Sequence, residues 1–138
     1  MAEFRCYTFT LWQLSPIQQG IQSGHAAVEL VTYHQSNPAV QSWARTYKTM
    51  ILLGGGEVSE LNELIVFLSN PNNPFAWKSF RESQESLGGL ITSVAIVLPD
   101  RIYVAAEALR RAFPVDLRVF SVWEQELIDR LRNSSLAR

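Results

Sequence analysis

The stretch LITSVAIVL at residues 90–98 bears on the fold more strongly than any other part of the chain. It is apolar at nearly every position and contains several β-branched residues, a composition typical of strands. A strand with one solvated face alternates apolar and polar residues, whereas a continuous apolar run indicates burial on both faces. We therefore predict that residues 90–98 form a central strand in a sheet that helices cover.

Further strands and helices are predicted on both sides of this segment. Strand-like runs of β-branched, aromatic or aliphatic residues occupy residues 4–12, 48–53 and 75–80. Start and stop signals place helices at residues 17–35, 59–68, 100–112 and 121–133, with a short helix after Asn37-Pro38. Two of these helices have clear caps, Ser15-Pro16 for the first and a Ser121–Glu124 capping box for the last.

The element order predicts one α/β domain over residues 1–138, with a mixed sheet of about four strands covered by helices. Residues 4–99 form its main part, and residues 100–138 add helices at the C-terminus, including an extra final one. The apolar stripe of that final helix, Trp123, Leu127 and Leu131, is expected to be either core or subunit interface. The second use predicts a homodimer or a larger oligomer.

Composition narrows the possible functions. A net charge of −1 argues against tight nonspecific binding of nucleic acid, which depends on neutralising many phosphates. The single cysteine, Cys6, is expected to be a small apolar strand residue, and with two histidines the chain has too few soft ligands to suggest a zinc site. We see no signal peptide and no apolar run near the roughly 18 residues of a membrane span, so we expect a cytoplasmic protein without cofactor or metal.

The first predicted helix, IQQGIQSGHAAV at residues 17–28 and onward, carries two stripes. Residues at steps of three and four form an apolar face that should pack on the sheet: Ile17, Ile21, Gly24, Val28 and Val31. Beside it runs a polar stripe of Gln18, Gln22, His25 and Glu29. Gly20 and Gly24 are costly inside a helix, which suggests that another backbone or a ligand comes close to them. The stripe can be a ligand-binding face or a solvated face.

This helix resembles the signature helix of the archaeal and eukaryotic type of peptidyl-tRNA hydrolase. That signature is a lysine, three residues, a glutamine, two residues and then His-Ala, and here Gln22 and His25-Ala26 match it. The resemblance continues through Trp43 and the strand at 48–53, and it ends with Gly88, Thr92 and Ala95-Ile96 in the last strand. It implies a fold of the peptidyl-tRNA-hydrolase kind over residues 4–99. If the chain is an enzyme, it implies catalytic roles for Gln22, His25, Glu82 and Thr92.

The sequence departs from the family pattern at two positions that bear on catalysis. Gln18 stands where the family has its lysine, and no aspartate precedes the last strand, where Glu82 and Glu85 are the acidic residues. A neutral amide holds an anion more weakly than a cation does. Ester cleavage also needs an activated water and stabilisation of the developing oxyanion. The set of catalytic groups is therefore incomplete.

Ligand binding is expected between the polar stripe of the first helix and the segment that leads into the last strand. The residues of this predicted site are Gln18, Gln22, His25, Arg81, Glu82, Ser83 and Thr92. Arg81 supplies the positive charge that Gln18 does not. Elsewhere, Gly54-Gly55-Gly56 lacks the Lys-Ser/Thr of a phosphate loop and predicts a turn, while Arg110-Arg111 is expected to be a solvated helix end.

Three functions remain open. The preferred one is a protein that binds a nucleotide-like ligand, either a tRNA 3′ end or a small nucleotide signal, and sequesters it with little or no hydrolysis. The second is an active peptidyl-tRNA hydrolase with a variant residue set. The third is a structural or interaction module in which the first helix only packs. The missing lysine separates the first two, and the Gln22–His25 stripe with Thr92 argues against the third.

Overall fold

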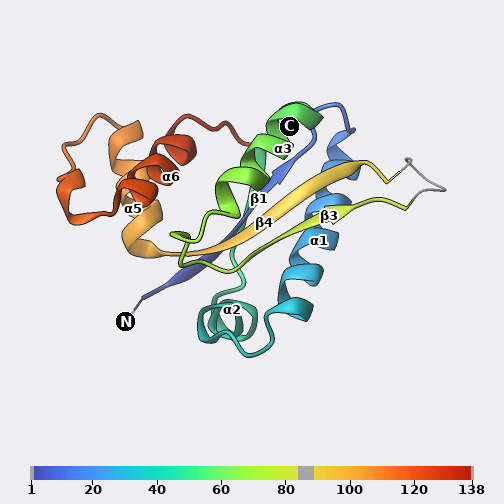
Figure 1. Cartoon of the computed structure of the whole chain (residues 1–138), viewed down its shortest axis with the longest axis horizontal. Coiled ribbons are helices and arrows are strands. Elements are labelled where there is room, and N and C mark those ends of the chain that lie inside the picture. Colours follow the sequence, from blue (N-terminus) through green and yellow to red (C-terminus); the bar gives the residue numbers. More distant parts are fainter. Residues whose placement is uncertain (1, 84–88, 138) are drawn as a thin grey trace.

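The computed structural model describes residues 2–83 and 89–137. Its four strands are β1 (Phe4–Thr10), β2 (Met50–Gly54), β3 (Trp77–Arg81) and β4 (Ile91–Pro99). They form one mixed sheet in the order β2-β1-β4-β3, where β1 and β2 are parallel and the other pairs are antiparallel. In Figure 1, α5 and α6 lie together at the left, α3 lies at the top and α1 at the right.

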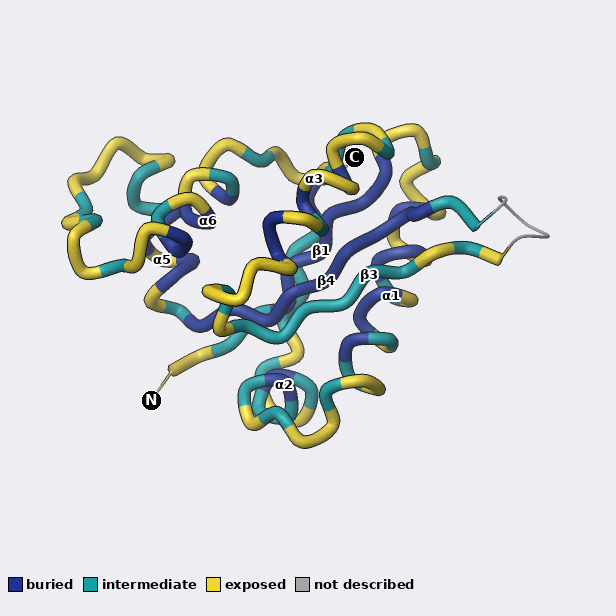
Figure 2. The backbone as a smooth tube through the Cα atoms, in the orientation of Figure 1, coloured by how far each residue is buried: buried dark blue, intermediate teal, exposed yellow. Residues whose placement is uncertain are grey.

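The position of β4 confirms the expectation drawn from the segment 90–98. β4 pairs with β1 on one side and β3 on the other, and all nine of its residues are buried. Figure 2 shows it as a continuous dark line through the middle of the molecule. By contrast, β2 is an edge strand in which only Leu53 is buried. The reason is that its outer side faces only the C-terminal tail, through a bridge between Leu53 and Leu136.

Helix α1 (Pro16–Tyr33) covers one face of the sheet, and Ser15 caps it as predicted by accepting a hydrogen bond from the Gln18 backbone N–H. Its orientation is not the predicted one. Most of the apolar stripe faces outward, with Ile17 76% and Val28 64% exposed, and only its last residue, Val31, packs against a core cluster among the described residues. The residues that face the sheet are Gln19, Gln22, Ser23, Ala26, Ala27 and Leu30.

The sheet explains this rotation of α1. Its face toward the helix carries buried hydroxyl groups, among them Thr8 and Thr92, and a buried hydroxyl needs a hydrogen-bond partner. The Thr8 hydroxyl donates to Ser23 Oγ at 2.9 Å, and Thr92 donates to Gln22. Polar and small residues therefore face the sheet, and the larger apolar ones face outward. No other backbone packs on the two helix glycines within the described part of the chain, since a Cβ added at Gly20 or Gly24 would meet no atom within 4 Å.

Next along the chain, α2 (Pro38–Ser42) begins at Asn37, as predicted, and continues into η1 (Trp43–Tyr47), a turn of π-helix. Val40 and Trp43 pack with Cys6 and Leu30 in a small core between these helices and the sheet. The helix α3 (Val58–Leu68) follows β2. Its N-cap is Glu57, which forms a capping box with Glu60, so the helix begins one residue before the predicted start at 59.

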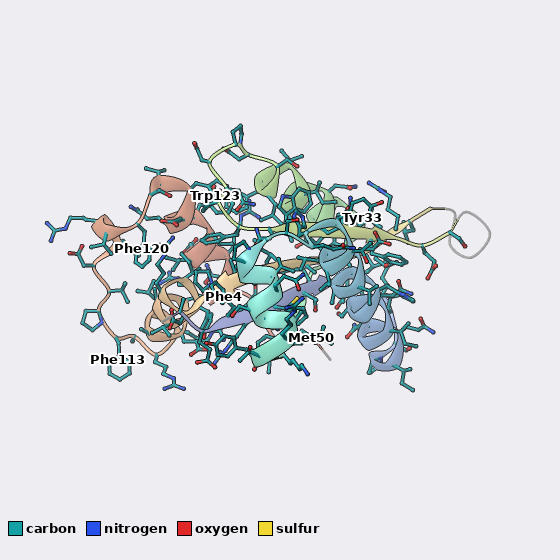
Figure 3. All side chains as sticks on the ribbon, turned by 90° about the horizontal axis from the view of Figure 1, so that it is seen from below. Phe4, Tyr33, Met50, Phe113, Phe120 and Trp123 are labelled. Atoms are coloured by element: carbon teal, nitrogen blue, oxygen red, sulfur yellow. The ribbon has the colours of Figure 1, made fainter. Side chains whose placement is uncertain are left out.

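Helices α5 (Asp100–Arg110) and α6 (Val122–Arg132) pack with α3 on the other face of the sheet, around the main core; the short η2 (Leu117–Val119) lies between them. The capping box of Ser121 and Glu124 forms as predicted. Figure 3 labels Trp123, which α6 carries. Trp123 stacks on Phe67 of α3 at 4.7 Å and donates its indole N–H to the Phe67 carbonyl. Trp123, Leu127 and Leu131 are therefore core residues and not a subunit interface, because residues of this chain cover them. A dimer would need another surface.

Within the described residues, no helix is both long enough and apolar enough to cross a membrane.

Candidate functional site

A chain of hydrogen bonds joins three residues that lie far apart in sequence. Thr92 on β4 donates its hydroxyl to Gln22 Oε1 on α1 at 2.7 Å, and Gln22 Nε2 donates to Glu82 Oε2 at 2.8 Å. Thr92 is fully buried and Gln22 is 3% exposed, whereas Glu82, just after β3, is only half-buried. The chain of bonds therefore runs from the interior of the molecule to a carboxylate at the surface.

The protonation state of Glu82 determines the direction of these bonds. An ionised carboxylate only accepts, so Gln22 must turn its NH₂ toward Glu82 and its carbonyl oxygen toward Thr92, whose hydroxyl then donates. The hydrogen bond from Gln22 is the main reason that the pKa of Glu82 lies below its ordinary value; the Ser83 backbone N–H and the nearby His25 lower it further. Glu82 is therefore held as a carboxylate, with its side chain in one position.

His25 lies on the exposed side of α1, and its ring stacks on Phe80 of β3 with centroids 4.8 Å apart and planes at 19°. We call His25 and Phe80, together with Gln22, Glu82 and Thr92, the Glu82 cluster. It combines a fixed carboxylate with a flat aromatic surface that reaches solvent through His25. Such a surface can stack a base, and such a carboxylate can accept hydrogen bonds from hydroxyl or amino groups.

The other predicted site residues are Gln18, Arg81 and Ser83, and of these Ser83 bonds to the cluster through its backbone. Gln18 is exposed on α1, one turn from Gln22, and its side chain forms no hydrogen bond with a described residue. Arg81 is exposed at the end of β3. Ser83 contributes its backbone N–H to Glu82 at 3.2 Å. Glu85 and Gly88, which entered the family resemblance, lie outside the described residues.

Sequence reasoning missed two contributors, Phe80 and the Thr8–Ser23 bond. Phe80 was assigned only to a short strand, yet it supplies the ring beneath His25. The signal that could have identified it is its place two residues before Glu82, because alternate residues of a strand lie on the same face. The hydrogen bond from Thr8 to Ser23 joins β1 to α1 next to Gln22 and so helps to position the Gln22 side chain over the sheet. Nothing in a strand of mixed residues indicates such a pairing.

Other candidate residues have structural roles. Burial raises the pKa of the Cys6 thiol to about 12, which keeps it protonated and unreactive. His34 Nε2 lies 3.0 Å from the Trp77 carbonyl oxygen and joins α1 to β3. Arg110 and Arg111 are exposed at the end of α5, as expected, and Arg110 also donates to the carbonyls of Leu131, Arg132 and Ser134 at the end of α6. In the part of the chain that the structure describes, no three His, Cys, Asp or Glu side chains gather as metal ligands would.

In sequence comparisons, no protein-family model and no curated protein matched this chain.

Proposed function

We propose that the chain binds a nucleotide-like ligand, either a tRNA 3′ end or a small nucleotide signal, at the Glu82 cluster and sequesters it with little or no hydrolysis. The observation that carries this proposal is the carboxylate of Glu82, which Gln22 fixes beside the His25–Phe80 stack. Carboxylates commonly accept hydrogen bonds from ribose hydroxyls, and aromatic or histidine rings stack bases. One nucleoside can use both features at once.

The phosphate of such a ligand would meet Arg81. This guanidinium is exposed beside Glu82, and it forms no ion pair with a described residue. Arginine binds phosphate through two parallel N–H donors, so one exposed arginine suits a single phosphate group. The sequence resemblance to peptidyl-tRNA hydrolases supports the same class of ligand, since Gln22, His25 and Thr92 are among the positions that carry it.

Peptidyl-tRNA ester hydrolysis is the second candidate, and the bonds among Gln22, Glu82 and Thr92 favour it. The resemblance assigns these three side chains to catalysis, and Gln22 is within hydrogen-bond distance of each of the other two. The geometry also weakens this candidate. A carboxylate with a lowered pKa is a poor general base, and the Thr92 proton is committed to Gln22. Gln18 adds no charge to stabilise an oxyanion.

Binding is tested with two probes, adenosine 5′-monophosphate and the trinucleotide CCA, in calorimetric titrations. We expect Gln22→Ala and His25→Ala to weaken binding about tenfold or more. His25→Ala removes a contact to the ligand worth about 1.4 kcal/mol, and Gln22→Ala removes the hydrogen bond that holds the Glu82 carboxylate in place. Arg81→Ala should weaken the binding of the monophosphate more than the binding of adenosine, which has no phosphate. Gln35→Ala is the matched control, since Gln35 is exposed just beyond α1. Unchanged affinity in all three variants, with unchanged melting temperature, would place the ligand elsewhere.

Hydrolysis is tested on a peptidyl-tRNA analogue with the purified chain. We expect turnover far below that of an active member of the peptidyl-tRNA hydrolase family, and no gain from raising the pH, because Glu82 is already ionised. Turnover comparable to that enzyme, abolished by His25→Ala, would replace the binding proposal with the hydrolase.

A further inference from the structure

A pocket of about 390 Å³ lies on the face of the sheet opposite to α1. It opens where β2 passes through Gly54–Gly56 into α3, and α6 with the residues after it completes the wall. The side chains that matter are those of Phe9, Glu60, Glu63, Leu64, Arg130 and Ser134. Its volume is within the range of small-molecule sites, about 300–1,000 Å³. The Glu82 cluster contributes none of its lining residues.

Arg130 enters this pocket with unused hydrogen-bond donors. Its guanidinium lies over the Phe67 ring at 4.4 Å, and the nearest carboxylate oxygen, on Glu126, is 3.7 Å away, too far for a hydrogen bond. Nε is buried and has no acceptor, and the side chain donates no hydrogen bond to any described residue. The guanidinium is placed by this stacking and by a long ion pair with Glu126, and its terminal N–H groups can still donate hydrogen bonds to the carboxylate of a ligand.

Helix α3 brings the opposite charge to the same pocket. Glu63 is exposed and pairs with no described residue, and Glu60 uses one oxygen to accept the Glu57 N–H at 3.2 Å. Neither forms an ion pair with Arg130, so the cation and the carboxylates stay separate. The apolar side chains of Phe9 and Leu64 also line the pocket. Such a pocket complements a ligand that carries one negative group, one positive group and an apolar part.

We propose that this pocket binds a small zwitterion, an α-amino acid or dipeptide with a free carboxylate and a free ammonium group. Arg130 holds the carboxylate, and Glu63 and Glu60 hold the ammonium. The side chain of the ligand packs on Phe9 and Leu64. A nucleotide does not fit this pocket as well, because two carboxylates repel its phosphates. The proposal is thus independent of the function assigned to the Glu82 cluster.

The glycines of this region serve the fold rather than the ligand. A Cβ on Gly55 would come within 2.5 Å of Leu61, and Gly56 has a φ of +75° with Glu60 against it. Tests therefore leave residues 54–56 unchanged and use their backbone amides as reporters. Because these amides line the pocket, their NMR resonances should shift when it fills.

The experiment titrates glycyl-leucine into the full chain and follows these amide shifts. Two matched probes each lack one charge: N-acetyl-glycyl-leucine lacks the ammonium and glycyl-leucine amide lacks the carboxylate. We expect saturable binding of glycyl-leucine and a loss of about tenfold or more for each blocked probe, because one charged hydrogen-bonded contact is removed. No shifts at millimolar dipeptide, or equal binding of all three probes, would overturn the proposal.

Variants assign each end of the ligand. Arg130→Gln should weaken the binding of glycyl-leucine and leave the binding of glycyl-leucine amide unchanged. Glu63→Gln should weaken the binding of glycyl-leucine and leave the binding of N-acetyl-glycyl-leucine unchanged. Arg130→Lys keeps the charge and part of the packing on Phe67, so it should bind at intermediate strength even if Arg130→Gln folds less well. Arg132→Gln is the control on the same helix, since Arg132 pairs with Asp129 outside the pocket lining. Equal losses for every probe in every variant would contradict the assignment.

Discussion

At the scale of single residues, the hydrogen bond from Gln22 to Glu82 can be tested by titration. Gln22 holds the pKa of Glu82 below its ordinary value, so the folded chain binds this proton less readily than the unfolded chain. Stability from this bond is therefore present above the ordinary pKa of glutamate and is lost as the pH falls through the lowered value. We expect the carboxyl resonance of Glu82 to titrate at a higher pH in Gln22→Ala than in the natural chain.

The control for this titration is Asp116, whose pKa is lowered by Arg118 and not by Gln22. Its midpoint should be the same in both proteins. Equal midpoints for Glu82 in the two proteins would mean that the side chains of Gln22 and Glu82 are apart in solution.

At the scale of single elements, the caps determine where helices begin. Ser121 Oγ accepts the Glu124 backbone N–H at 3.1 Å, and the Glu124 carboxylate accepts the Ser121 N–H at 3.1 Å. Ser121→Ala removes one side of this box and should lower the free energy of unfolding by about 1 kcal/mol. The measurement is urea denaturation. Ser135→Ala, on an exposed residue whose side chain forms no hydrogen bond with a described residue, should change it by less than about 0.5 kcal/mol.

At the scale of the whole molecule, the main core includes α6. Leu127 is fully buried among residues of this chain, so Leu127→Ala should lower the free energy of unfolding by about 2–5 kcal/mol. Val122→Ala, on the same helix at 85% exposure, is the control and should be nearly neutral. Thermal denaturation and sedimentation are measured together. If Leu127→Ala changed only the oligomeric state and not the stability of the monomer, the helix would face a partner chain instead.

Removal of residues 121–138 tests the same part of the core. Removing them takes away Trp123 from its stack on Phe67 and exposes the main core. We expect the truncated chain to lose cooperative unfolding rather than to become a folded monomer. A truncated chain with the same melting temperature as the full chain would contradict this expectation.

The sequence by itself determined the features whose causes are local. The continuous apolar run of β4 requires burial on both faces, and the Ser15-Pro16 and Ser121–Glu124 caps satisfy donors within one helical turn. The polar stripe of α1 was also visible, and Gln22 and His25 in it proved to adjoin Glu82. These predictions succeed because the residues that decide them are neighbours in the chain.

Only the tertiary structure decided how α1 is rotated and what its polar groups contact. Gln22 bonds to Glu82, 60 residues away, and to Thr92, 70 residues away, and no local pattern records such a pairing. Hydrophobic periodicity placed Ile17 and Val28 inward, but the buried hydroxyls of Thr8 and Thr92 required polar partners and turned that face outward. An unpaired hydroxyl in the interior costs about 1–3 kcal/mol, which is comparable with the gain from burying an isoleucine. Two such hydroxyls can therefore set the orientation of the helix.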